Sequence, residues 1–160
     1  MCALQVGELE EQLVIFNVGD EVYGVDTSKV QEIIRMQAIT HVPGAAPFVK
    51  GVINLRGRII PVIELHQRFG LEARDPGRSS RIVVVETEGH VVGAVVDAVS
   101  EVLRIPTGCV EPPSPIVTGP DSDYIRGIAK LEGRLITLLQ LDRLLTGEQR
   151  ASLQARAISN

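Results

Sequence analysis

Aromatic side chains are scarce in this 160-residue sequence, which has no tryptophan, two tyrosines and three phenylalanines. Base-stacking platforms and grooves for proline-rich peptides are both built from clustered aromatic side chains. The five aromatics are scattered between Phe16 and Tyr124 and do not predict such a cluster. Their scarcity argues against both kinds of ligand and favours aliphatic surfaces for binding partners.

Residues that carry metal or catalytic chemistry are also sparse. His41, His66 and His90 lie far apart without metal-ligand spacing, and Cys2 and Cys109 form neither a zinc pattern nor a disulfide framework. We interpret both cysteines as incidental thiols. No glycine-rich phosphate loop or nucleophile motif is present. The sequence therefore predicts no metal site, no cofactor, no catalytic residue and no enzymatic activity.

Positive charge is in short supply as well. Lys and Arg number 16 against 20 Asp and Glu, which gives a formal net charge of −4. Because nucleic-acid binding needs a basic face, we expect no nucleic-acid partner. No apolar run approaches the length of a membrane span, and the acidic segment MCALQVGELEEQ lacks the apolar stretch of a secretory signal. We expect a cytoplasmic protein without direct membrane insertion.

What the sequence does contain is an internal repeat. The first repeat covers about residues 12–69 and the second about residues 81–145, within one domain of residues 10–146 that is followed by a polar tail of residues 147–160. The gapless alignments are 12–35 on 81–104, an offset of 81 − 12 = 69, and 51–69 on 127–145, an offset of 127 − 51 = 76.

Short runs rich in valine and isoleucine, bounded by turn residues, predict strands almost throughout both repeats. Glycine in Gly19-Asp20, Arg56-Gly57, Glu88-Gly89 and Glu132-Gly133 can supply the positive φ of a tight hairpin. Five short strands with tight turns close most easily into a barrel, so we predict an all-β fold of two similar five-stranded barrels that arose by duplication. The expected strands are about 12–18, 21–27, 30–36, 51–56 and 58–65, and about 81–87, 90–97, 99–105, 127–132 and 134–141.

Helices are expected only as short pieces. They are predicted at residues 66–69 and 142–145, after the last strand of each repeat, and as a polar tail helix over residues 148–157. Residues 111–123, EPPSPIVTGPDSD, hold four of the nine prolines and predict an irregular surface loop.

Three segments, taken in order, carry a resemblance to a known family. They are Tyr23–Asp26 together with Lys29–Ile33 (YGVD and KVQEI), Gly51–Val62 (GVINLRGRIIPV), and Val95–Val102 (VVDAVSEV). They resemble the CheW family, the coupling proteins of bacterial chemotaxis arrays, and the likeness runs from about residue 12 to residue 145. The resemblance implies two SH3-like five-stranded barrels without enzymatic activity. It also implies two partners, the cytoplasmic tips of chemoreceptors and the regulatory domain of the histidine kinase CheA, itself a structural relative, in arrays at the inner face of the membrane.

The resemblance also implies site residues. Val30, Glu32 and Arg56 correspond to family positions near the receptor-binding groove, and Gly51 and Gly57 correspond to glycines that matter for coupling. Arg56 is the sharpest of these, because its counterpart in the second repeat is Glu132 and the two hairpin tips therefore carry opposite charges.

Each of these positions also has a purely structural interpretation. Val30 recurs as Val99 and can belong to the core, while charged residues commonly decorate hairpin tips such as that of Arg56. Gly51 and Gly57 recur as Gly127 and Gly133, which points first to backbone geometry. The kinase-contacting surface of the family is largely aliphatic and is not assigned from the sequence.

Two alternatives to a chemotaxis adaptor stay open. One is a CheW-like adaptor of a non-chemotactic kinase pathway, in surface motility or development. The other is a small β-barrel enzyme or ligand-binding protein. That second alternative requires a pocket with convergent polar groups, and the sequence offers no cluster to build one.

Overall fold

The computed structural model describes residues 9–45, 48–72, 75–87, 89–113, 124–131 and 133–141. These residues form strands with only three short helical pieces, so the all-β class is confirmed. The first repeat contains β1 (Glu10–Val18), β2 (Glu21–Asp26), the 3-10 turn η1 (Thr27–Lys29), β3 (Val30–Arg35), β4 (Val49–Leu55), β5 (Arg58–Glu64) and α1 (Leu65–Arg68). The second contains β6 (Arg81–Thr87), β7 (His90–Val96), β8 (Ala98–Pro106), the 3-10 turn η2 (Thr107–Cys109), β9 (Val110–Glu111), β10 (Ile125–Leu131) and β11 (Arg134–Leu139).

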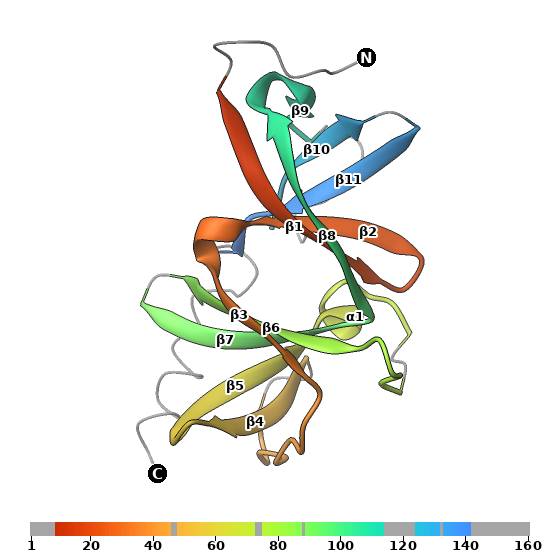
Figure 1. Ribbon diagram of the computed structural model, residues 1–160. Coiled ribbons are helices and arrows are strands. Elements are labelled where there is room, and N and C mark those ends of the chain that lie inside the picture. The colour runs from red at the N-terminus through yellow and green to blue at the C-terminus, as the bar shows by residue number, and fades with distance from the viewer. Residues whose placement is uncertain are drawn as a thin grey trace.

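The strands form two small sheets, one above the other in Figure 1. The six-stranded sheet has the order β8-β1-β2-β11-β10-β9, and the five-stranded sheet has the order β3-β6-β7-β5-β4. The prediction of two small SH3-like β subdomains is confirmed. Their strands, however, are not divided by repeat.

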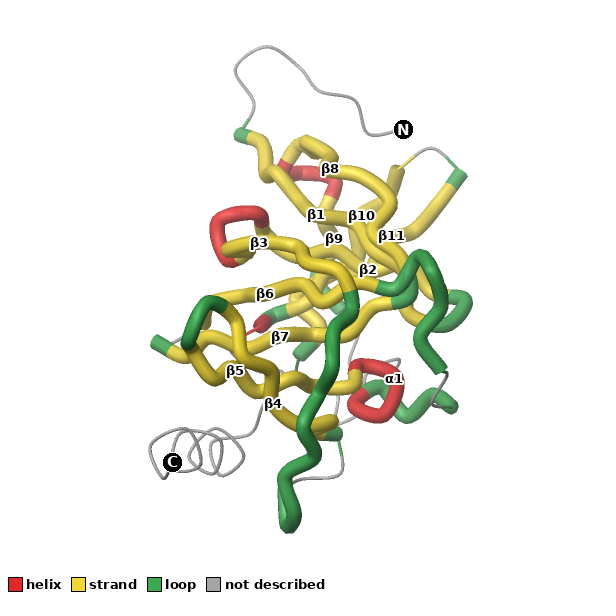
Figure 2. The backbone as a smooth tube through the Cα atoms, turned by 60° about the horizontal axis from the view of Figure 1, so that its bottom comes forward, coloured by secondary structure: helices red, strands yellow, loops and turns green. Residues whose placement is uncertain are grey.

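Each sheet combines strands of both repeats. Figure 1 shows the β1–β2 hairpin of the first repeat between β8 and β11 of the second, and Figure 2 shows the same mixing from another side. The β6–β7 hairpin of the second repeat lies in turn between β3 and β5 of the first. Equivalent strands offer similar hydrogen-bonding edges, so the repeat pattern predicts the strands without identifying their partners. This exchange differs from the expectation that the five strands of one repeat close on themselves.

The repeat does persist in the local geometry. The hairpin β4–β5 matches β10–β11, and the parallel pairing of β5 with β7 (Val62 opposite Gly93) matches that of β11 with β2 (Leu138 opposite Gly24). The predicted hairpin turns are present at Gly19, Gly57, Gly89 and Gly133, each with a positive φ.

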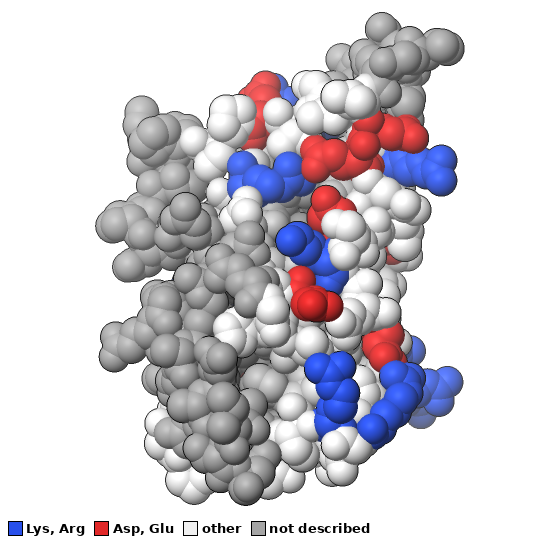
Figure 3. Space-filling model, turned by 90° about the vertical axis from the view of Figure 1, so that its left-hand side faces the viewer, with Lys and Arg blue, Asp and Glu red and all other residues white. Residues whose placement is uncertain are grey.

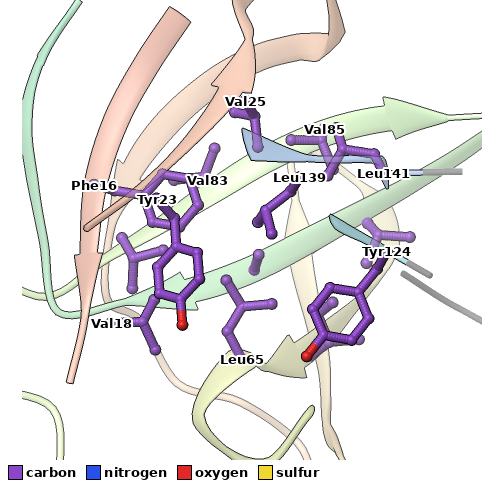
Figure 4. Packing of buried hydrophobic residues seen from close by; sticks show 14 of the residues in the cluster. Phe16, Val18, Tyr23, Val25, Leu65, Val83, Val85, Tyr124, Leu139 and Leu141 are labelled. Atoms are coloured by element: carbon purple, nitrogen blue, oxygen red, sulfur yellow. The ribbon is translucent and has the colours of Figure 1, made fainter. Parts of the chain in front are cut away.

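The largest core cluster lies between the two sheets. Phe16, Tyr23, Phe69 and Tyr124 form a continuous stack in it, with successive ring centroids 6.2, 4.6 and 5.3 Å apart. Figure 4 shows the residues of β1, β2 and α1 that meet there. The prediction that the few aromatics do not cluster is therefore wrong. Because three of the four rings are buried and Phe69 is half-buried, the stack joins the sheets and does not form a binding platform.

The remaining sequence predictions have mixed outcomes. A helix after β5 is confirmed as α1. The interpretation of Cys109 as an incidental thiol is wrong, because Cys109 is buried and disulfide-bonded. The predicted helices at 142–145 and 148–157, the tail, and most of the 111–123 loop lie outside the described residues.

Candidate protein-binding site

The tip of the β4–β5 hairpin is a two-residue turn made of Arg56 and Gly57. Both residues have positive φ, 54° for Arg56 and 84° for Gly57, as a type I′ turn requires. The Gly57 N–H donates a hydrogen bond of 2.9 Å to Asn54 Oδ1, which fixes the turn from inside the hairpin. The Arg56 side chain is 73% exposed, so a rigid turn holds an accessible guanidinium.

Arg56 forms a two-pronged ion pair with Glu32 on β3. Nη1 donates to Oε2 at 2.5 Å and Nη2 donates to Oε1 at 2.9 Å. The hydrogen bond from Arg56 lowers the pKa of Glu32, and the same bond raises the pKa of Arg56. Since β3 is one outer strand of the five-stranded sheet and β4 is the other, this pair joins the two edges of the sheet.

The second repeat contains a related ion pair. Arg134 at the start of β11 donates from Nη2 to Oε1 of Glu101 on the outer strand β8, at 2.8 Å. Glu101 is the counterpart of Glu32, but Arg134 is the counterpart of Arg58 and not of Arg56. Both sheets thus use a glutamate on an outer strand and an arginine of the opposing hairpin, and only the first places that arginine at the tip.

The other predicted site residues have contacts or backbone angles that matter to the fold. Val30 is half-buried, pairs with Val85 of β6 and packs against the core between the sheets. Gly51 is buried, and a Cβ there would lie 2.2 Å from the backbone oxygen of Thr40. Gly57 has open space around it, so it is required by its positive φ. Only Glu32 and Arg56 are thus brought into direct contact.

Sequence reasoning missed a set of exposed aliphatic side chains. Ile33 and Ile59 are 39% and 41% exposed, and their counterparts Val102 and Leu135 are 52% and 64% exposed. Each follows directly after Glu32, Arg58, Glu101 or Arg134 in the sequence. Their recurrence at matching positions of both repeats was the available signal. We call Val102 and Leu135 the second-repeat apolar pair.

The family model of the CheW-like domain matches residues 12–149. This chain belongs to the CheW-like family. The chemotaxis protein CheW of Rhizobium meliloti is 35% identical over 139 residues, which cover 87% of this chain and 90% of that protein. Protein FrzA of Myxococcus xanthus is 32% identical over 145 residues, covering 89% and 90% of the two chains. The crystal structure of the scaffolding protein CheW from Thermoanaerobacter tengcongensis is similar with a TM-score of 0.82 and 40% identity, over 88% of this chain and 96% of that one.

The surface of this CheW-like domain carries mixed charge. On the face shown in Figure 3, acidic and basic side chains are interspersed in the upper half, and basic side chains gather beside an acidic group in the lower part. A hollow of about 150 Å³ is lined by Glu11, Asp26, Lys29 and Arg126, which is small beside the pockets of roughly 300 to 1,000 Å³ that hold metabolites. None of the helices formed by the described residues has the length and apolar character that a membrane crossing requires.

Proposed function

We propose that this chain is a non-enzymatic scaffold that couples the cytoplasmic tips of chemoreceptors to the histidine kinase CheA. The observation that carries the proposal is family membership over residues 12–149, together with the likeness to a scaffolding CheW over 88% of the chain. Its place is the cytoplasm, in receptor arrays at the inner face of the membrane. Residues 10–146 make up the coupling domain.

The receptor site in this proposal contains Val30, Glu32 and Arg56. The exposed guanidinium of Arg56 supports this choice, because five N–H donors are available and the contact with Glu32 uses two of them. The remaining donors suit carboxylate or carbonyl oxygens on a receptor helix. Glu32 positions the guanidinium, and Val30 supports β3 from the core side.

The kinase surface in this proposal is the second-repeat apolar pair. Val102 and Leu135 are the more exposed of the two sets of aliphatics, and they lie in the sheet that does not carry Arg56. A receptor at Arg56 and a kinase domain at Leu135 would therefore occupy different subdomains. Exposed aliphatic side chains of this size are typical of protein contacts when they gather in a patch.

The test is a reconstitution with separate purified partners. A receptor cytoplasmic fragment and the CheA regulatory domain should each bind the chain alone, and all three should form a ternary complex. Leu135→Glu should weaken kinase binding at least tenfold, a loss of about 1.4 kcal/mol, while receptor binding stays unchanged. Ile59→Glu, at the matching position of the first repeat, is the control and should leave kinase binding intact. Absence of binding to either partner would refute the coupling function.

A second candidate is an adaptor of a non-chemotactic kinase pathway. The likeness to protein FrzA, at 32% identity over 145 residues, gives it only weak support, because the other relatives compared with this chain are named as chemotaxis proteins. A pull-down from a lysate of the source bacterium separates the two candidates. Retention of a chemotaxis kinase with chemoreceptors supports the first, and retention of a different histidine kinase supports the second.

A further inference from the structure

His66 on α1 lies buried between two carboxylates. Its side chain is 2% exposed, Nδ1 lies 2.8 Å from Glu64 Oε1, and Nε2 lies 3.0 Å from Asp97 Oδ2. Glu64 ends β5, and Asp97 stands between β7 and β8. Each ring nitrogen therefore faces an oxygen of a different carboxylate, on opposite sides of the ring.

The partners of the two ring nitrogens indicate the charge of this ring. A neutral imidazole has one N–H donor and one bare nitrogen, and an ionised carboxylate can only accept. Lys50 beside Glu64 and the Gly19 N–H beside Asp97 favour ionised carboxylates. With both carboxylates ionised, a neutral His66 would leave a bare nitrogen against a carboxylate oxygen in a buried place, where an unmade hydrogen bond is costly. We propose that His66 is a buried imidazolium at neutral pH and that its two ring N–H groups tie the two sheets together.

The surrounding charges favour the same state. Glu64 Oε2 lies 3.3 Å from Lys50 Nζ on β4, and Asp97 Oδ2 also accepts a 2.7 Å hydrogen bond from the Gly19 N–H. With His66 charged, the formal charges of Lys50, Glu64, His66 and Asp97 sum to zero. With His66 neutral they leave one uncompensated negative charge, which a buried site disfavours.

The remaining charged group of α1 points elsewhere. The Arg68 guanidinium lies over the ring of Tyr124, 4.7 Å from its centroid, and 5.9 Å from that of Phe48. It belongs with the aromatic stack. Among the described residues, no group of three His, Cys, Asp or Glu side chains converges as a metal site would require. We call the cluster of Lys50, Glu64, His66 and Asp97 the proton site.

The position of the cluster gives it a structural role. Asp97 lies where the chain passes from β7 in one sheet to β8 in the other, and its backbone N–H donates a 2.8 Å hydrogen bond to the backbone oxygen of Asn17 on β1. Through Asp97, the ring of His66 joins α1, which follows the five-stranded sheet, to the β1–β2 hairpin of the six-stranded sheet.

The second repeat does not contain the same cluster. The counterparts of Glu64 and His66 are Gln140 and Asp142, and the counterpart of Asp97 is Ser28. The proton site is therefore a property of one junction between the sheets and not a by-product of the duplication.

Nitrogen-15 NMR of the full chain tests the charge directly. At neutral pH both ring nitrogens of His66 should carry a hydrogen, whereas a neutral ring shows one protonated and one bare nitrogen. Exposed His41 and half-buried His90 give reference signals in the same spectrum, and His66→Gln assigns the third signal. Asp97→Asn, which keeps the shape but removes the charge, should make His66 neutral at the same pH. A bare ring nitrogen in the unmutated protein, or no change in Asp97→Asn, would overturn the proposal.

Amide hydrogen exchange tests the link between the sheets. His66→Ala leaves Asp97 without its imidazolium, so exchange at the Gly19 amide should rise at least about fivefold. The Gly57 amide is the matched control, because it is also a hairpin-turn glycine bonded to a side chain, the uncharged Asn54. Unchanged Gly19 exchange would refute the link, and so would an equal rise at Gly57. If His66→Ala does not fold, the same comparison is made in His66→Gln, which removes the imidazolium and leaves the acceptor of the Gly19 N–H in place.

Discussion

Arg56 is an exposed residue with little freedom to move. Its backbone is fixed in a left-handed turn, and its guanidinium is held by the two hydrogen bonds that it donates to Glu32. A side chain that is already ordered loses less conformational entropy on binding, which improves affinity without adding contacts. The repeat alone identified the opposite charges of the two tips, but it could not place Glu32 beside Arg56, because that contact depends on how β3 and β4 face each other.

Arg56→Glu should weaken binding of a receptor cytoplasmic fragment at least tenfold. The change removes charge-assisted donors and places a second carboxylate beside Glu32, so the tip would repel the carboxylate and carbonyl oxygens that the proposed site binds. Because the side chain is exposed, the fold should persist. Titration calorimetry with the receptor fragment, together with thermal melts, measures both effects.

Arg134→Glu is the matched control for this substitution. It breaks the comparable pair with Glu101 in the other sheet, at a side chain that is also exposed. Receptor affinity should change less than threefold. Equal losses for the two variants, or unfolding of Arg56→Glu alone, would reduce Arg56 to a structural residue.

Tyr23 provides a pH-dependent probe of the core between the sheets. Burial raises the pKa of Tyr23 from 10.0 to about 12, with Glu21 and Tyr124 as smaller causes. As the pH rises, the Tyr23 hydroxyl therefore loses its proton in the unfolded chain before it does so in the folded protein. The contribution of neutral Tyr23 to the free energy of unfolding is complete below pH 10.0 and is lost as the pH rises toward about 12. When the pH is raised over this range, the free energy of unfolding should fall in both proteins, and the fall should be about 1 to 2 kcal/mol smaller in Tyr23→Phe than in the unmutated protein. Parallel losses in both proteins would contradict the shift.

At the scale of elements, β4 and β10 each contain a glycine at which the backbone of another segment passes close by. A Cβ at Gly51 would lie 2.2 Å from the Thr40 oxygen, and one at Gly127 would lie 2.7 Å from the Glu111 oxygen. Thr40 pairs with Val52 and Glu111 pairs with Ile128, so both crossings are bridges to the residue after the glycine. The two glycines therefore have the same cause, close approach of a paired backbone.

Gly51→Ala should destabilise the protein by about 3 kcal/mol, the upper end of the usual cost of overpacking, and Gly127→Ala by about 2 kcal/mol. Backbone atoms form both obstacles, so neither site can relax by rotating a side chain. Gly108→Ala is the control, because nothing lies within 4 Å of a Cβ there. Chemical denaturation of the three variants measures the differences. A Gly51→Ala protein as stable as Gly108→Ala would exclude the steric cause and leave a binding role for Gly51.

The strands and turns could be predicted because their signals are local. Short runs rich in valine and isoleucine predicted the strands, and Arg56-Gly57 and Gly19-Asp20 marked turns that have the expected positive φ. The aromatic stack could not be predicted, since Phe16, Tyr23, Phe69 and Tyr124 come together only when the sheets pack. The contact between His66 and Asp97 is likewise long-range and has no spacing that a sequence pattern would reveal.

At the scale of the whole molecule, the exchange of hairpins makes the two sheets depend on each other. In the five-stranded sheet, β3 pairs with β6, and β5 pairs with β7. Removal of the β6–β7 hairpin would therefore leave β3 without its partner and would break the hydrogen-bonded connection between β3 and β5. Removal of β1 and β2 would separate β8 from β11 in the same way. The large core cluster, which draws residues from both sheets, adds to this dependence. We therefore expect the two subdomains to unfold in one cooperative transition, as single domains of this size commonly do.

Cutting the chain in the exposed loop after Asp75 tests this dependence. Residues 1–75 and residues 76–160 each contain one repeat, and each alone lacks strands from the middle of both sheets. Neither fragment should show the dispersed amide spectrum of a folded protein. Mixed in equal amounts, they should associate and recover it, because every strand is then present and the cut lies in a loop. A fragment that folded alone into a stable five-stranded barrel would show that strand pairing within one repeat competes with the exchanged arrangement. Cooperative unfolding of the intact chain would then need another cause than the exchanged hairpins.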